Sequence, residues 1–191
     1  MKKSDKRADI MQVALELIAE RGFHGAPMSM IANKAGVAAG TIYCYFESKD
    51  LLITELHQEL EEKINAHLQK GYPVEQPLRE RFLYINRALL RYFIAYPLHF
   101  RYMEQYFNSP YGISRHKDKL LDKSGNNDIL MDVFEHGIRQ QVLKELPKAA
   151  LFSLAFGPLS TLMRDHSLGF IMLDDSLIEQ ITEACWDAIK K

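Results

Sequence analysis

The sequence predicts an all-α protein with a small three-helix head at its N-terminus and a larger helical body, about nine helices in all. Apolar residues recur with helical spacing along most of the 191-residue chain. No stretch alternates apolar and polar residues for long enough to form a strand. The chain is 47% hydrophobic and 26% charged, which is typical of one large or two small globular domains.

The helices of the first half are expected from their apolar spacing and from the residues at their ends. The first carries an apolar stripe from Ile10 to Ile18 and is expected to end at Gly22. A long helix is predicted over residues 49–70, because every fourth position is Leu or Ile. Pro77 is a favourable first helical residue and begins a helix that runs to Tyr96-Pro97.

Four more helices are expected in the second half. Residues 108–112 are rich in Asn, Ser, Pro and Gly and are predicted to be a loop. Gly157-Pro158 is expected to kink the helix that contains it. The predicted helices are 98–107, one that begins at Ile129 and ends near Pro147, 148–168 and 174–189.

Charge and cysteine content exclude several classes of protein. The chain has 24 Lys and Arg against 25 Asp and Glu, so it is no polycation that binds nucleic acid through bulk charge. Two cysteines, Cys44 and Cys185, are too few for a disulfide scaffold and favour the reducing cytoplasm. No run approaches the ~18 apolar residues of a membrane span, so no membrane association is expected.

Residues 28–46 have the pattern of a helix-turn-helix. Two short helices are expected on either side of Ala35-Gly36-Val37, where the glycine permits a positive φ and the valine fills the corner. Ile42 and Phe46 lie four residues apart on the second helix and are predicted to face the core of the head. The second helix of such a unit lies in the major groove of DNA.

These residues resemble the N-terminal domain of the TetR family of transcriptional regulators. The resemblance implies a homodimer with a DNA-binding head, residues 1–48, and a helical body, residues 49–191. It also implies that the body binds a small-molecule effector and that the protein then releases its double-stranded operator. The resemblance covers about residues 8–55 and rests on Arg21-Gly22-Phe23, Ile31-Ala32, Ala35-Gly36-Val37, Gly40-Thr41-Ile42-Tyr43, Tyr45-Phe46, Lys49 and Leu51-Leu52.

The same resemblance supplies the predicted DNA contacts. Thr41 and Tyr43 match recognition-helix contacts, Tyr45 matches a phosphate-touching position, and Lys49 matches the cationic start of the next helix. Their hydroxyl groups and the ammonium suit phosphate oxygens. Ser29, Ala39 and Gly40 complete the predicted set.

The sequence departs from the family pattern at two points. Ala26-Pro27 and Ala38 stand where Ser or Thr usually caps the two short helices, at a cost of roughly 1 kcal/mol for a lost cap. Residues 35–46 contain no Arg, Lys, Asn or Gln for bidentate base readout. We therefore expect discrimination through apolar contacts, backbone approach at Gly40, DNA shape and a flexible basic arm. That arm consists of Lys2, Lys3, Lys6 and Arg7.

A cluster of aromatic residues predicts where an effector binds. Ten of the 20 aromatic residues fall within residues 82–111, which favours a pocket for a small apolar or aromatic molecule. The alternative is that these side chains form the core of the body. The predicted lining residues are Phe82, Ile85, Leu89, Phe93, Phe100, Met103, Phe107, Met131 and Phe134.

The last two helices are predicted to form the homodimer interface, as two helices per subunit make a four-helix bundle. Trp186 fits either this interface or the internal core. The interface residues expected are Leu151, Leu154, Ala155, Leu159, Leu162, Leu177, Ile181, Ala184 and Ala188.

An enzyme is the less favoured alternative. The chain has no Glu-x-x-His pair and no phosphate-binding glycine loop, so neither a metal nor a cofactor is expected. A DNA-binding protein without a small-molecule ligand is the second alternative to a ligand-responsive regulator.

Overall fold

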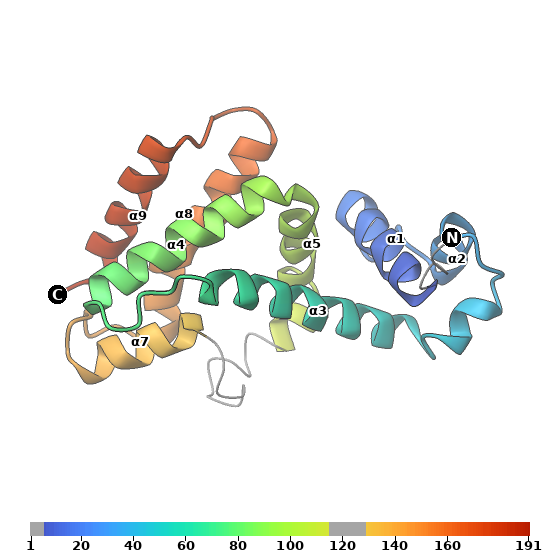
Figure 1. Cartoon of the computed structure of the whole chain (residues 1–191), viewed down its shortest axis with the longest axis horizontal. Helices are drawn as coiled ribbons and strands as arrows, with labels where there is room; N and C mark the ends of the chain where they lie inside the picture. Colours follow the sequence, from blue (N-terminus) through green and yellow to red (C-terminus); the bar gives the residue numbers. More distant parts are fainter. Residues whose placement is uncertain (1–5, 115–128) are drawn as a thin grey trace. The chain divides into compact units, whose positions relative to one another are not determined.

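The computed structural model of the chain describes residues 6–114 and 129–191 (Figure 1). These residues contain no β-sheet, only an isolated bridge between Leu143 and Lys190. The prediction of an all-α fold is confirmed. The helices are α1 (Lys6–Arg21), α2 (Met28–Lys34), the 3-10 helix η1 (Thr41–Cys44), α3 (Lys49–Gln69), α4 (Leu78–Ala95), α5 (Pro97–Phe107), α7 (Ile129–Arg139), α8 (Lys148–Ser167) and α9 (Asp175–Ile189).

Most helix ends follow from local chemistry. Gly22 and Gly71, which follow α1 and α3, adopt φ of +68° and +89°, a conformation that costs little only for glycine. Asp174 caps α9, because its side chain accepts a hydrogen bond from the backbone N–H of Leu177 at 2.8 Å. Pro158 lies inside α8, as predicted.

Two predicted boundaries are wrong. The helix that begins at Ile129 ends at Arg139 rather than near Pro147, because Gln141 takes a positive φ of 56°. Residues 110–114 are helical, although residues 108–112 were predicted to be a loop. Pro110 is tolerated in a first helical turn, and the Ser109 hydroxyl accepts a hydrogen bond from the backbone N–H of Gly112 at 3.4 Å.

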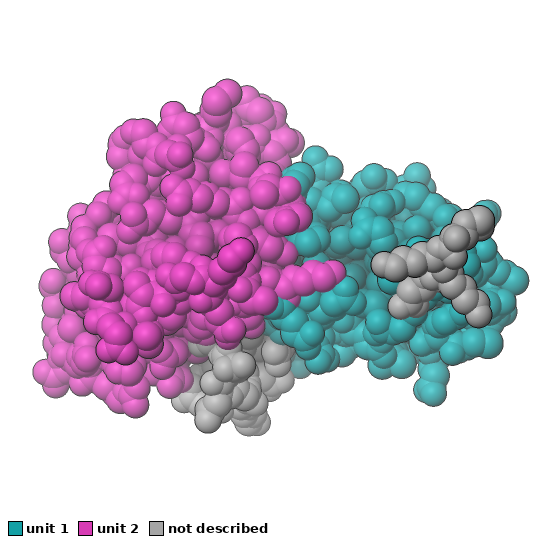
Figure 2. All heavy atoms as spheres, viewed as in Figure 1, with its two compact units in different colours: residues 1–62, 97–116 teal, residues 63–96, 117–191 magenta. Residues whose placement is uncertain are grey.

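The chain divides into two compact units (Figure 2). Unit 1 consists of residues 1–62 and 97–116, and unit 2 consists of residues 63–96 and 117–191. The division differs from the boundary predicted between residues 48 and 49, because α5 and the first part of α3 belong with the head. Tyr102 of α5 is completely buried in unit 1 and donates its hydroxyl proton to the Ile53 carbonyl of α3 at 3.1 Å.

Aromatic side chains from α4, α7, α8 and α9 form the core of unit 2. Phe82 lies 5.4 Å from Trp186 and 6.3 Å from Phe156, measured between ring centroids. Phe134 lies 5.6 Å from Phe156. Trp186 is therefore a residue of the internal core, which decides between the two alternatives for it.

The predicted interface residues of α8 divide into two sets. Leu151, Ala155 and Leu159 are buried within unit 2, so they belong to its own core. Leu154 is exposed and Leu162 is half-buried. On α9, Leu177, Ile181 and Ala188 are half-buried and Ala184 is exposed.

Candidate nucleic-acid interface

The helix-turn-helix is built from α2 and η1. Gly36 adopts φ of +65° in the turn, as predicted, and the backbone N–H of Val37 donates to the Ala32 carbonyl at 3.0 Å. Ile42 and Phe46 are completely buried, which confirms the predicted inward face. The second helix is a single 3-10 turn rather than an α-helix, in keeping with its shortness and with Gly40 as an N-cap that makes no side-chain hydrogen bond.

Burial of Ile42 and Phe46 directs the residues between and around them outward. Tyr43 is 53% exposed and Tyr45 is 40% exposed. Thr41 is exposed as well, so three hydroxyl groups stand on one short segment. An exposed tyrosine adds little to the core, and its hydroxyl is free to bind a polar partner.

The other predicted contact residues of this surface are small. Ser29, Ala39 and Gly40 are all exposed. A Cβ atom added at Gly40 would meet nothing within 4 Å, so the backbone there is open to close approach.

Lys49 occupies a different environment from the rest of the predicted set. It is half-buried, and its ammonium donates a hydrogen bond to the Phe23 carbonyl in the loop after α1. Burial lowers the pKa of Lys49, and the Asp50 carboxylate opposes this. One hydrogen bond of the Lys49 ammonium thus joins the start of α3 to the loop after α1. The other two N–H groups of the ammonium are not used in this contact.

A second contact supports the same corner of the head. The Tyr111 hydroxyl donates to the Asp50 carboxylate, and this hydrogen bond raises the pKa of Tyr111 to about 12. The Tyr111 ring lies 5.6 Å from that of Phe23. Phe23, Asp50 and Tyr111 were not predicted as positioning residues, since 61 residues separate the hydrogen-bonded pair. Tyr111 belongs to the aromatic cluster over residues 82–111, and Phe23 belongs to the motif that carries the family resemblance.

The expected basic arm is partly replaced by ordered helix. Lys6 and Arg7 belong to α1, and Arg7 forms an ion pair with Glu55 at 2.6 Å. The prediction that these two belong to a flexible arm is therefore wrong, while Lys2 and Lys3 lie outside the described residues. Neither α2 nor η1 has a side-chain cap, although their N-caps are Pro27 and Gly40 rather than the predicted Ala26 and Ala38.

The nine predicted effector-binding residues do not gather in one unit. Phe107 is 49% exposed on α5, while Phe82 and Phe134 take part in the aromatic core of unit 2. Unit 2 holds Phe82, Ile85, Leu89, Phe93, Met131 and Phe134, whereas unit 1 holds Phe100, Met103 and Phe107.

Residues 6–114 and 129–191 contain no group of three His, Cys, Asp or Glu side chains that could hold a metal ion. No helix within these ranges is long and apolar enough to cross a membrane.

Comparison with known proteins assigns both parts of the chain. Residues 10–56 match the family of bacterial regulatory proteins named tetR, and residues 77–190 match the tetracyclin repressor-like C-terminal domain. A relative from Haemophilus influenzae, described as an uncharacterized HTH-type transcriptional regulator, is 27% identical over 190 residues, which are 99% of this chain and 98% of the relative.

Solved structures agree with this assignment. A protein from Vibrio parahaemolyticus assigned to the TetR family is 34% identical, and the match covers 98% of this chain and 99% of that one with a TM-score of 0.75. A TetR family transcription regulator from Marinobacter aquaeolei VT8 is 22% identical and shares the fold, with a TM-score of 0.81 over 100% of this chain and 99% of its own. The chain therefore belongs to the TetR family of bacterial regulatory proteins, which are transcriptional regulators that bind DNA and not enzymes.

Proposed function

We propose that the protein is a cytoplasmic, ligand-responsive repressor that binds a palindromic operator as a homodimer and is released by a small apolar or aromatic effector. The observation that carries the proposal is the exposed, hydroxyl-bearing η1 segment seated on buried Ile42 and Phe46. A stable core positions this segment, and the side chains that it presents have no role in that core.

The DNA contacts follow from the chemistry of this surface. The hydroxyl groups of Thr41, Tyr43 and Tyr45 donate to phosphate oxygens, and Ser29 adds a further phosphate contact. Ala39 and Gly40 permit the backbone to approach the groove closely, and two N–H groups of Lys49 remain for the DNA backbone. Because η1 carries no charged or amide side chain, sequence preference comes mainly from apolar contacts and DNA shape.

The outer faces of α8 and α9 support a homodimer. Residues 149–163 of α8 contain no charged side chain, although many of them are exposed. Leu154 and Gly157 are among the exposed residues, so this face combines apolar and small side chains and suits a closely packed helix. On α9, Ile181 and Ala184 are accessible beside it. A two-fold pair of such faces makes a four-helix bundle and places two heads against symmetric half-sites.

In this proposal, the long helix α3 transmits effector binding to the DNA-binding surface. It begins with Lys49 in unit 1, and the division between the units falls within it, after Glu62. An effector bound in unit 2 releases DNA only if it favours a different arrangement of the two heads. Linkage then requires operator DNA to weaken effector binding by the same factor, and a coupling of about 1–3 kcal/mol is typical.

The test is a double variant, Tyr43→Phe with Tyr45→Phe. Each lost hydrogen bond to phosphate is worth about 1 kcal/mol, and the proposed dimer loses four, so operator affinity should fall about a hundredfold or more. The melting temperature should not change, because both hydroxyl groups are exposed. Tyr96→Phe removes the hydroxyl of an equally exposed tyrosine in unit 2 and serves as the control. Full operator affinity in the double variant, or full affinity in a protein that sediments as a monomer, would contradict the proposal.

A further inference from the structure

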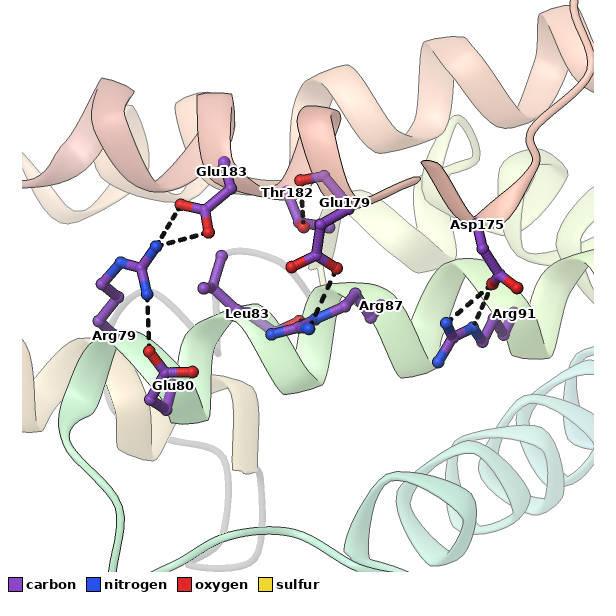
Figure 3. Close-up of polar contacts among 9 residues, drawn as sticks. All are labelled: Arg79, Glu80, Leu83, Arg87, Arg91, Asp175, Glu179, Thr182 and Glu183. Atoms are coloured by element: carbon purple, nitrogen blue, oxygen red, sulfur yellow. Dashed lines mark hydrogen bonds and ion pairs between the residues drawn. The ribbon is translucent and has the colours of Figure 1, made fainter. Parts of the chain in front are cut away.

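A row of ion pairs joins α4 to α9 within unit 2 (Figure 3). The carboxylates stand at every fourth residue of α9 and face arginines of α4. Most of these side chains are well exposed, with Asp175 at 82%, so the pairs contribute little to stability. The pairs are Arg79–Glu183 at 2.5 Å, Arg87–Glu179 at 3.1 Å and Arg91–Asp175 at 2.8 Å.

Two of these arginines also line a groove on α4. The groove has a volume of about 500 Å³, and Arg87 and Arg91 both contribute to its wall, whereas Arg79 does not. Pro73, Tyr84 and Ala88 supply apolar surface. The volume is within the range of sites for small organic molecules.

Helical geometry explains why Arg87 and Arg91 both line the groove and pair with carboxylates of α9. Tyr84 and Ala88 lie four residues apart and form one stripe of α4, which faces the groove. Arg79 and Arg87 lie on the neighbouring stripe, which faces α9. Because Arg87 and Arg91 stand where the two stripes meet, their guanidinium groups can turn from α9 to a molecule in the groove without a change in the helix.

The charges of the groove favour an anion. Its acidic residue, Glu80, is already paired with Arg79 at 2.6 Å. The Tyr84 hydroxyl donates to the Lys70 carbonyl at 2.6 Å, which holds the aromatic ring in place. His67 and Gln76 complete the polar part of the wall, so the cationic groups that an anionic ligand can recruit from α9 are the guanidinium groups of Arg87 and Arg91.

Neither arginine forms a two-oxygen fork with its present partner. Arg91 places its Nε and Nη2 atoms on the same oxygen of Asp175, at 3.2 and 2.8 Å. Arg87 uses Nη1 for one oxygen of Glu179 and Nε for the Leu83 carbonyl. A ligand carboxylate can offer two oxygens to one planar guanidinium, which is the stronger arrangement.

We propose that this groove binds a small organic carboxylate with an aromatic or apolar body, and that the ligand takes Arg87 and Arg91 from Glu179 and Asp175. The inference names a chemical class for the effector of the proposed function. Binding itself does not depend on the proposed function. Only the consequence of binding does: the ligand would loosen the attachment of α9, the helix proposed to form the dimer interface.

Phenylacetate and its uncharged isostere phenylacetamide test the site by calorimetry on the full chain without DNA. The acid should bind saturably and about tenfold or more tightly than the amide, as expected for charge-assisted hydrogen bonds. Arg87→Gln with Arg91→Gln should abolish this preference. Glu183→Gln is the matched control, because it breaks the third ion pair of the row and leaves the Arg79–Glu80 pair beside the groove in place, and it should keep the preference.

Competition with α9 is tested by Asp175→Asn with Glu179→Gln. Removal of the competing carboxylates should tighten phenylacetate binding several-fold, whereas Glu183→Gln should leave it unchanged. Equal affinity for acid and amide, no saturable binding of phenylacetate, an equal loss of the preference in Glu183→Gln, or weaker binding in Asp175→Asn with Glu179→Gln would overturn the inference. Operator affinity measured on the ligand-free wild-type protein keeps the two proposals apart, since intact operator binding there would leave the proposed function standing if phenylacetate fails to bind.

Discussion

Replacement of Lys49 by methionine removes the ammonium bound to the Phe23 carbonyl and keeps an apolar stem of similar length. A hydrogen bond to a charged group is worth about 1.5–3 kcal/mol when buried. Since Lys49 is only half-buried, we expect the free energy of unfolding to fall by about 1–2 kcal/mol. For a chain of this size that corresponds to a decrease of roughly 2–8 °C in melting temperature.

Operator binding by the same variant provides a second readout. The two remaining N–H groups of the Lys49 ammonium are proposed to contact phosphate. Their loss should reduce the slope of log affinity against log salt by about 0.9 for each protomer bound. Lys70→Met removes an exposed charge in unit 2 and should change neither quantity.

The two readouts refute different steps of the reasoning. A melting temperature equal to that of the wild type would show that the Phe23 contact does not stabilise the head. A weaker operator affinity with an unchanged salt slope would show that Lys49 acts by positioning η1 and makes no phosphate contact.

Three further predictions use other contacts. Tyr111→Phe should reduce the loss of folding stability at alkaline pH. The pKa of Tyr111 is raised to about 12 in the folded chain. The contribution of Tyr111 to the free energy of unfolding is therefore present below about pH 10, the usual tyrosine value, and is lost as the pH rises to about 12. Unfolding curves between those pH values that coincide for variant and wild type would exclude this contribution. Gly40→Ala should weaken operator binding at an unchanged melting temperature, because a methyl group there meets nothing within 4 Å, whereas Gly36→Ala should cost about 1–2 kcal/mol at its positive φ. Lower stability of the first or full stability of the second would contradict the backbone geometry. The emission of Trp186 should stay the same when the proposed dimer is diluted to monomer, since this ring is buried within unit 2; a red shift would place it at the interface.

Local features of the sequence predicted much of the fold correctly. Gly22 and Gly71 follow α1 and α3 because glycine adopts positive φ at little cost. The four-residue spacing of Leu and Ile over residues 49–70 predicted α3, since that spacing buries one helical face. The inward direction of Ile42 and Phe46 followed from the same rule, and it left Tyr43 and Tyr45 exposed.

Features that depend on distant partners were not predictable in this way. Lys49 was predicted only as a DNA contact, and its ammonium also donates to a carbonyl 26 residues away. Arg7 was expected in a flexible arm, and Glu55 holds it on α1. Neither partner can be inferred from residue spacing within one helix, because each lies in a different segment of the chain.

By itself, the sequence determined the order of most helices, the helix-turn-helix and the residues that it presents, because each depends on spacing within a few turns of chain. Only the tertiary structure decided that α5 belongs with the head, that Trp186 lies in the core of unit 2, and that Arg87 and Arg91 face both α9 and a groove. Those outcomes depend on which helices pack together. Packing is selected by the summed burial of apolar surface from segments far apart in sequence, and helical periodicity shows only that a face is buried, not against which partner.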